Sequence, residues 1–185
     1  MQLIVLVDYD NVKQERKERT AGDVDFNLEL IVDAISRLRA ASFPEYRDVR
    51  IRLYGGWTDI NGALLEGALL VASAAGRVRG RRSGGRFTAE LAVGLFDCEY
   101  SRLKGLYRDG GQKMVDTLIV SDAVRITLAY EAKVLIMSDD EDMLPGLLGC
   151  HIHNPKAVVK RRAKIDSWHN RDLVARSGLM TEWGS

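Results

Sequence analysis

The stretch Lys133-Val134-Leu135-Ile136-Met137-Ser138-Asp139-Asp140-Glu141-Asp142 decides the fold prediction. Its apolar run has the length and the β-branched content of a strand that is buried on both faces, which is typical of a parallel sheet. The run ends abruptly in four consecutive acids. Open α/β sheets bind their ligands beside the carboxyl ends of the strands, so the acids stand where a site is expected.

A second stretch near the start of the chain has the same design. The apolar run from Leu3 to Val7 leads directly into Asp8-Tyr9-Asp10-Asn11. Either acidic segment alone is compatible with a solvated loop. Two strands that both end in acids favour one shared site, and hard carboxylate oxygens are the ligands that Mg²⁺ or Mn²⁺ prefers.

Length and composition limit the class of protein. The chain has 185 residues, of which 46% are hydrophobic, and a net charge of +1; this predicts one globular domain over 1–185 and confines any polyanion binding to local patches. Cys98 and Cys150 are far apart, which argues for free thiols and against a zinc site. The longest apolar region, 63–75, is interrupted by Glu66 and is too short to cross a bilayer. With no signal-peptide pattern before Asp8, a cytoplasmic protein without membrane contact is expected.

Hydrophobic periodicity predicts alternating strands and helices. Strands are expected over 2–8, 49–57, the second half of 87–98 and 133–138. Helices are expected over 25–41, 58–74, 114–130 and 142–148, and loops over 12–24, 77–86 and 105–112. Beyond residue 153 the pattern weakens, and 165–183 is left open between strand and helix. This order predicts an α/β fold with a central, mostly parallel sheet and helices on both faces.

Asp116 lies in the first turn of the helix expected over 114–130. Two interpretations stay open for it: a favourable interaction with the helix dipole, or a further acid directed at the group formed by Asp8, Asp10, Asp140 and Asp142. Asp122 lies six residues later, which rotates it away from Asp116. It is expected to be structural, with Arg125 as a candidate partner.

Three segments together resemble a known family. These are Val7-Asp8-Tyr9-Asp10-Asn11, the segment from Lys113 to Leu118 that continues to Asp122, and the segment from Ser138 to Pro145. They resemble, in order and spacing, the signatures of the NYN branch of the PIN-like (LabA-like) metal-dependent ribonucleases, over residues 3 to about 150. The resemblance implies a three-layer PIN-like fold and a Mg²⁺- or Mn²⁺-dependent endoribonuclease that hydrolyses phosphodiester bonds of single-stranded RNA. It implies a metal site formed by Asp8, Asp116, Asp140 and Asp142, with Asn11 as a polar support.

The chain departs from the family pattern at several positions. Asp10 replaces a glutamate, Glu141 a serine, and Tyr9, Met114 and Asp139 replace glycines. None of the four acids is lost, so an active hydrolase is favoured. One alternative is a catalytically weak or inactive NYN-type RNA-binding module. Another is a haloacid-dehalogenase-type Mg²⁺-dependent phosphatase, whose D-x-D motif matches residues 8–10 but in which Asp116 has no role.

Basic residues supply the expected contacts to RNA. They gather in the Gly/Arg-rich segment 77–86 and in the basic C-terminal region 156–185, although charge runs are often only solvated surface. The residues expected to bind RNA are Arg79, Arg81, Arg82, Arg86, Lys113, Lys160, Arg161 and Arg162. Tyr54, Trp57 or Tyr107 could stack on bases, but core packing is the commoner role of such aromatics. Oligomeric state and protein partners stay open.

Overall fold

The computed structural model describes residues 1–12, 16–97, 106–108, 111–138, 140, 142, 145–146, 157–161 and 180–182. The helices are α1 (Ala21–Ser42), α2 (Glu66–Arg77) and α3 (Val115–Ala129). The strands are β1 (Gln2–Asp8), β2 (Asp48–Tyr54), β3 (Arg79–Arg82), β4 (Gly85–Leu91), β5 (Leu106–Arg108), β6 (Gly111–Lys113), β7 (Ala132–Met137), β8 (Ala157–Arg161) and β9 (Met180–Glu182). None of the described helices is long and apolar enough to cross a membrane.

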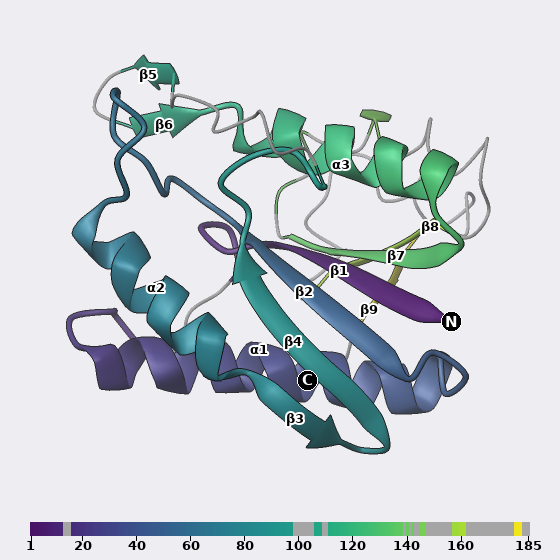
Figure 1. The fold of residues 1–185 in the computed structure, drawn as a ribbon. Coiled ribbons are helices and arrows are strands. Elements are labelled where there is room, and N and C mark those ends of the chain that lie inside the picture. Colours follow the sequence, from purple (N-terminus) through teal and green to yellow (C-terminus); the bar gives the residue numbers. More distant parts are fainter. Residues whose placement is uncertain are drawn as a thin grey trace.

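Seven strands form one sheet in the order β3-β4-β2-β1-β7-β8-β9 (Figure 1). Every neighbouring pair is parallel except β3 and β4. The chain builds outward from β1 through β2 to β4 and then returns to the other side of β1 with β7. The direction of winding therefore reverses between β1 and β7, and this reversal is the place where ligands bind in open α/β sheets.

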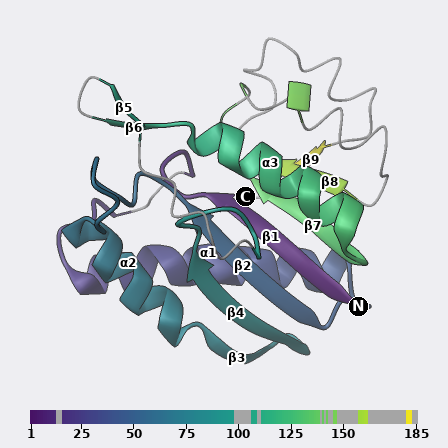
Figure 2. The same cartoon turned by 45° about the horizontal axis from the view of Figure 1, so that its top comes forward.

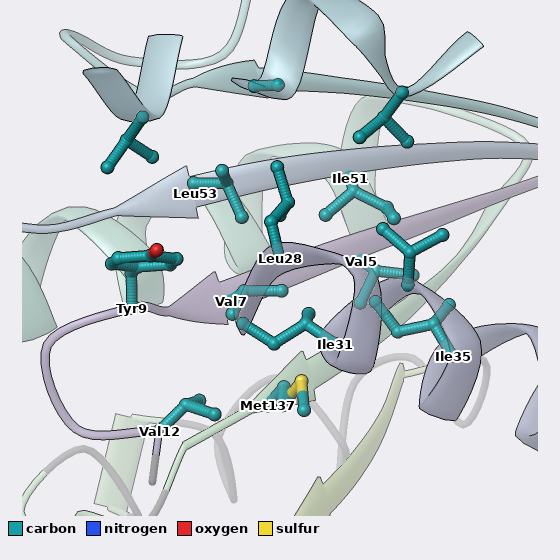
Figure 3. Packing of buried hydrophobic residues seen from close by; sticks show 14 of the residues in the cluster. Val5, Val7, Tyr9, Val12, Leu28, Ile31, Ile35, Ile51, Leu53 and Met137 are labelled. Carbon is teal, nitrogen blue, oxygen red and sulfur yellow. The ribbon is translucent and has the colours of Figure 1, made fainter. Parts of the chain in front are cut away.

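Helices cover both faces of the sheet, with α1 and α2 on one face and α3 on the other (Figure 2). Side chains of β1 alternate between the two cores: Val5 and Val7 pack with α1, whereas Ile4 and Leu6 pack with α3. Figure 3 shows Val5 and Val7 beside Leu28, Ile31 and Ile35 of α1. Burial on both faces explains the continuous apolar runs. The mixed α/β class and the mostly parallel sheet are confirmed.

Two helix starts differ from the predictions. Helix α1 begins at Ala21 because Thr20 and Asp23 form a capping box, in which each side chain accepts a hydrogen bond from the other's backbone N–H. The predicted cap at Asp25 was wrong. Helix α2 begins at Glu66 rather than near Thr58, because Asp59 Oδ1 accepts hydrogen bonds from Asn61 N and Ala63 N, both at 2.8 Å, and thereby holds a turn.

Three segments also differ from the predictions. Residues 77–86 do not form a loop: β3 and β4 form an antiparallel hairpin that turns at Ser83 and Gly84, both with positive φ. Residues 85–91, rather than the second half of 87–98, form β4, because this segment completes the parallel ladder with β2. The expected connector 105–112 is instead the antiparallel pair β5–β6, which extends to Lys113.

The C-terminal region, where the sequence pattern does not distinguish strand from helix over 165–183, adds the parallel strands β8 and β9 to the sheet. Most of the short helix expected over 142–148 lies outside the described residues.

Candidate functional site

Asp8 ends strand β1 next to the point where the winding of the sheet reverses. Its side chain is fully buried, and its Oδ2 accepts hydrogen bonds from Ser138 Oγ at 2.6 Å and from Asn11 Nδ2 at 3.0 Å. Its Oδ1 is buried and has no hydrogen-bond partner among the described residues. Burial raises the pKa of this carboxyl and the charge of Asp10 adds to the rise, whereas the bonds from Ser138 and Asn11 oppose it.

Ser138 connects Asp8 to the acidic segment that follows β7. Its hydroxyl donates to Asp8 and accepts a hydrogen bond from Asp140 N at 3.0 Å. Asp140 Oδ1 in turn accepts from Asp142 N at 3.0 Å. No role was predicted for Ser138 from the sequence. The signal that could have revealed it is its place between an apolar strand and a run of acids, at the strand end that meets Asp8 in a parallel sheet.

Asp116 lies in the first turn of α3, above the same edge of the sheet. Burial raises its pKa to about 6, and the negative charges of Asp8, Asp140 and Asp142 contribute to the rise. The structure therefore brings four of the predicted acids, which come from three separate segments, into one electrostatic neighbourhood.

Met114 sets the start of α3. It is the N-cap of the helix and has φ of 76°, a left-handed conformation that glycine adopts more readily than methionine does. Its side chain is about half exposed, so the residue meets the backbone requirement of the helix start without a packing role in the core.

The donor set can be compared with the needs of a divalent cation. Among the described residues, no three carboxylate, imidazole or thiolate side chains lie close enough together to hold an ion by themselves. Mg²⁺ retains several water ligands and commonly binds proteins through one or two carboxylates, so a closed protein cage is not required. The buried Asp8 Oδ1 without a partner and the mutual repulsion at Asp116 are both features that a cation would relieve. The residues present fit such an ion.

The raised pKa of Asp116 predicts a pH-dependent stability. Its folded pKa of about 6 lies above the ordinary value of 3.8, so the folded state binds the proton more tightly than the unfolded chain. The metal-free protein should therefore lose stability as pH rises through this interval, and the loss should be complete above it. Asp116→Asn should remove this loss. Urea unfolding at about pH 4 and at neutral pH should show Asp116→Asn stabilised relative to wild type only at neutral pH; equal differences at both values would contradict the prediction.

Asp10 is directed toward the loop after β2. Its Oδ2 accepts a hydrogen bond from Gly56 N at 2.8 Å, and partial withdrawal of the carboxyl from water raises its pKa. This contact requires a small residue at position 55: a Cβ there would lie 2.9 Å from the Trp57 ring and 3.1 Å from Asp10 Oδ1. Trp57 packs on Tyr9, with ring centroids 5.5 Å apart, and is not free to move away.

Gly55→Ala should therefore destabilise the fold, by about 1–3 kcal/mol as for other overpacked sites. The matched control is Gly67→Ala in α2, where no atom lies within 4 Å of an added Cβ and where alanine favours the helix. Urea unfolding should show opposite signs for the two variants. If the Gly55→Ala protein is as stable as wild type, the Trp57 side chain must move aside to make room for the added methyl group.

The aromatic and helical residues named from the sequence occupy the core. Tyr54 is fully buried and donates a hydrogen bond to Asp122 Oδ2 at 2.6 Å. Trp57 is 6% exposed and its Nε1 donates to Leu53 O at 2.8 Å. Neither ring is available for stacking on a base, and the side chain of Tyr107 lies outside the described part. Asp122 is structural as predicted, but its cationic neighbour is Arg52 at 3.5 Å and not Arg125.

The predicted RNA-binding arginines lie away from the acids. Arg86 is in register with Asp48, which is in register with Gln2 at the start of β1, six residues from Asp8 and therefore roughly 20 Å away along the strand. Arg82 is bound by Glu29 and Asp33 of α1, at 2.7 and 2.9 Å. The side chains of Lys113, Lys160, Arg161 and Arg162 lie outside the described part of the chain.

Comparisons with protein-family models, with curated proteins and with solved structures found no match for this chain.

Proposed function

We propose that this protein is a metal-dependent phosphodiesterase, and more particularly a ribonuclease of the NYN, PIN-like type that hydrolyses single-stranded RNA. The observation that carries the proposal is the convergence of Asp8, Asp116, Asp140 and Asp142 at the carboxyl edge of a parallel sheet, where its winding reverses. Clustered negative charges that raise the pKa of one carboxyl, as they do for Asp116, are a frequent feature of functional sites.

The residues divide into ligands and supports in this proposal. Asp8, Asp116, Asp140 and Asp142 would hold Mg²⁺ or Mn²⁺, some of them through the waters that such an ion retains. The ion would supply a water of lowered pKa and stabilise the charge that develops on the phosphate. Ser138 and Asn11 orient Asp8 by binding its Oδ2, which leaves Oδ1 free to act as a ligand. Ser138 also fixes the backbone of Asp140, so the acids after β1 and β7 keep their spacing.

The burial of Asp8 favours this proposal over a haloacid-dehalogenase-type phosphatase. A phosphatase in which the first aspartate of the D-x-D motif attacked the phosphorus atom would need that carboxylate to reach the substrate. Asp8 holds that place in the motif, but it is fully buried and its Oδ2 is engaged by two donors. A buried carboxylate suits a ligand that orients an ion better than a group that attacks substrate.

The test compares two substrates under the same conditions. Purified protein is incubated with end-labelled single-stranded RNA or with p-nitrophenyl phosphate, in Mg²⁺, in Mn²⁺ and in chelator. We expect cleavage of the RNA that depends on the metal and no release of p-nitrophenol. Release of p-nitrophenol without RNA cleavage would support the phosphatase. RNA binding without cleavage in either metal would support an RNA-binding module with an inactive site.

A further inference from the structure

We propose that the sheet surface formed by β3, β4 and β2, on the side of α3, binds the phosphate backbone of single-stranded RNA and leads it toward Asp8. We call this surface the open basic face; its cations are Arg79 and Arg81 on β3, Arg86 on β4 and Arg50 on β2, and it also carries Thr88 and the acids Asp48 and Glu90. This inference rests on the proposed ribonuclease function and assigns that function its substrate path.

The strand register places these residues on one face. Cross-strand partners point to the same side of a sheet, and Arg79 is paired with Thr88 and Arg81 with Arg86. The intervening residues Gly80 and Arg82 point to the other side, where the Phe87 partner of Gly80 is buried against α1 and α2. Helix α3 packs on β1 and β7, at a distance from β3 (Figure 2). Arg79, Arg81, Arg86 and Thr88 are accordingly exposed.

The charges of the hairpin differ between its two sides. Arg82, directed at α1, is bound by Glu29 and Asp33. On the open basic face, neither Arg79 nor Arg81 has a carboxylate partner among the described residues, and Arg81 stands directly opposite another cation, Arg86. Like charges at directly opposite positions destabilise a sheet, so this pair has no benefit for folding. A polyanion would remove that repulsion.

Arg86 and Arg50 extend this charge across the sheet. Arg86 is bound to Asp48 at 2.9 Å, with both side chains largely exposed. Such exposed pairs contribute little, so Arg86 can exchange the carboxylate for a phosphate. Arg50, on the next strand, lies in the same row as Arg79 and Thr88 and has two acidic partners, Glu90 at 2.9 Å and Asp97 at 3.6 Å.

The open basic face and Asp8 lie on the same side of the sheet. Asp8 is in register with Tyr54, whose ring belongs to the core under α3, and Arg50 is four residues before Tyr54 on the same strand. These four residues span roughly 13 Å, and β3 is three strands from β1, or roughly 14 Å. An extended polyanion on this face would have to span about 20 Å between Arg79 and Asp8, passing over Phe96, whose ring lies against Arg50 and Arg52.

The test measures RNA binding in chelator, so that cleavage does not enter. The variant Arg79→Gln/Arg81→Gln removes the two arginines of this face that have no carboxylate partner within the described part of the chain. The variant Arg19→Gln/Arg37→Gln removes two exposed arginines elsewhere, with the same change of net charge. Fluorescence anisotropy with labelled single-stranded RNA is recorded across a salt series. We expect Arg79→Gln/Arg81→Gln to bind more weakly and to lower the slope of log K against log salt by about 1.4, at about 0.7 for each phosphate that the variant no longer neutralises. The Arg19→Gln/Arg37→Gln protein should match wild type.

Three other outcomes would each contradict the inference, and the measurements distinguish them from one another. Equal slopes for the two double variants would remove the open basic face from RNA binding while leaving the ribonuclease proposal intact. Wild-type protein that neither binds RNA in chelator nor cleaves it with metal would overturn both. Binding of polyglutamate but not of RNA, abolished in Arg79→Gln/Arg81→Gln, would identify an acidic protein rather than RNA as the partner.

Discussion

Asp8→Asn should abolish metal-dependent RNA cleavage, with a reduction on the order of a thousandfold or more, and should leave the metal-free protein at least as stable as wild type at neutral pH. The first effect follows from the proposed role: an amide offers one oxygen where the carboxylate offers two and carries no charge to hold an ion. The second follows from burial, which raises the pKa of Asp8 and so makes its ionised form costly. The amide oxygen can keep the hydrogen bonds from Ser138 and Asn11.

The control for this prediction is Glu131→Gln. Glu131 is an exposed acid that lies just before β7, at the opposite end of the strand from Ser138. Thermal melting of wild type and both variants is followed in chelator and across a Mg²⁺ and Mn²⁺ titration, beside RNA cleavage. Wild type and Glu131→Gln should gain melting temperature with metal, and Asp8→Asn should not. An Asp8→Asn protein that cleaves RNA and gains as much from metal as wild type would remove Asp8 from the site.

Asp122→Ala should strongly destabilise the fold, by about 3–5 kcal/mol of unfolding free energy. Asp122 is fully buried in α3, and its carboxylate accepts from Tyr54 Oη at 2.6 Å and from Phe96 N at 2.7 Å. Arg52, itself only 6% exposed, lies 3.5 Å away. Removal of the carboxylate leaves the buried guanidinium of Arg52 with one fewer neighbouring negative charge. It also leaves the buried N–H of Phe96 without its acceptor.

Two further variants separate this effect from ordinary changes in stability. Asp25→Ala breaks the exposed ion pair with Arg77 and should cost less than about 1 kcal/mol. Tyr54→Phe removes two hydrogen bonds of the buried network, the one to Asp122 and the one from Arg52 Nε, and should cost about 1–3 kcal/mol. Urea unfolding at neutral pH measures all three. If Asp122→Ala costs no more than Asp25→Ala, the network around Arg52 does not stabilise α3 against the sheet.

Local patterns were sufficient for the elements with strong periodicity. The runs 2–8 and 133–138 form β1 and β7 within a residue of the predicted bounds, because strands buried on both faces must be apolar throughout. The helix expected over 114–130 is α3. The same patterns do not give the start of α1, which the capping box of Thr20 and Asp23 sets, and they do not distinguish the edge hairpin at 77–86 from a loop. Edge strands commonly carry charge, so composition alone resembles that of a loop.

The sequence by itself determined that acids follow two buried strands and that a further acid opens a helix, because these facts depend only on order along the chain. It did not determine which strands are neighbours. The pairing of β1 with β7 places Ser138 against Asp8, and the fold of α3 over β1 brings Asp116 to the same edge. The register of β3 with β4 likewise decides that Arg82 binds α1 while Arg79 and Arg81 face outward. Such contacts join residues that are far apart in sequence, and their geometry is set by packing of the whole sheet, so only the tertiary structure decides which charges meet and which remain exposed.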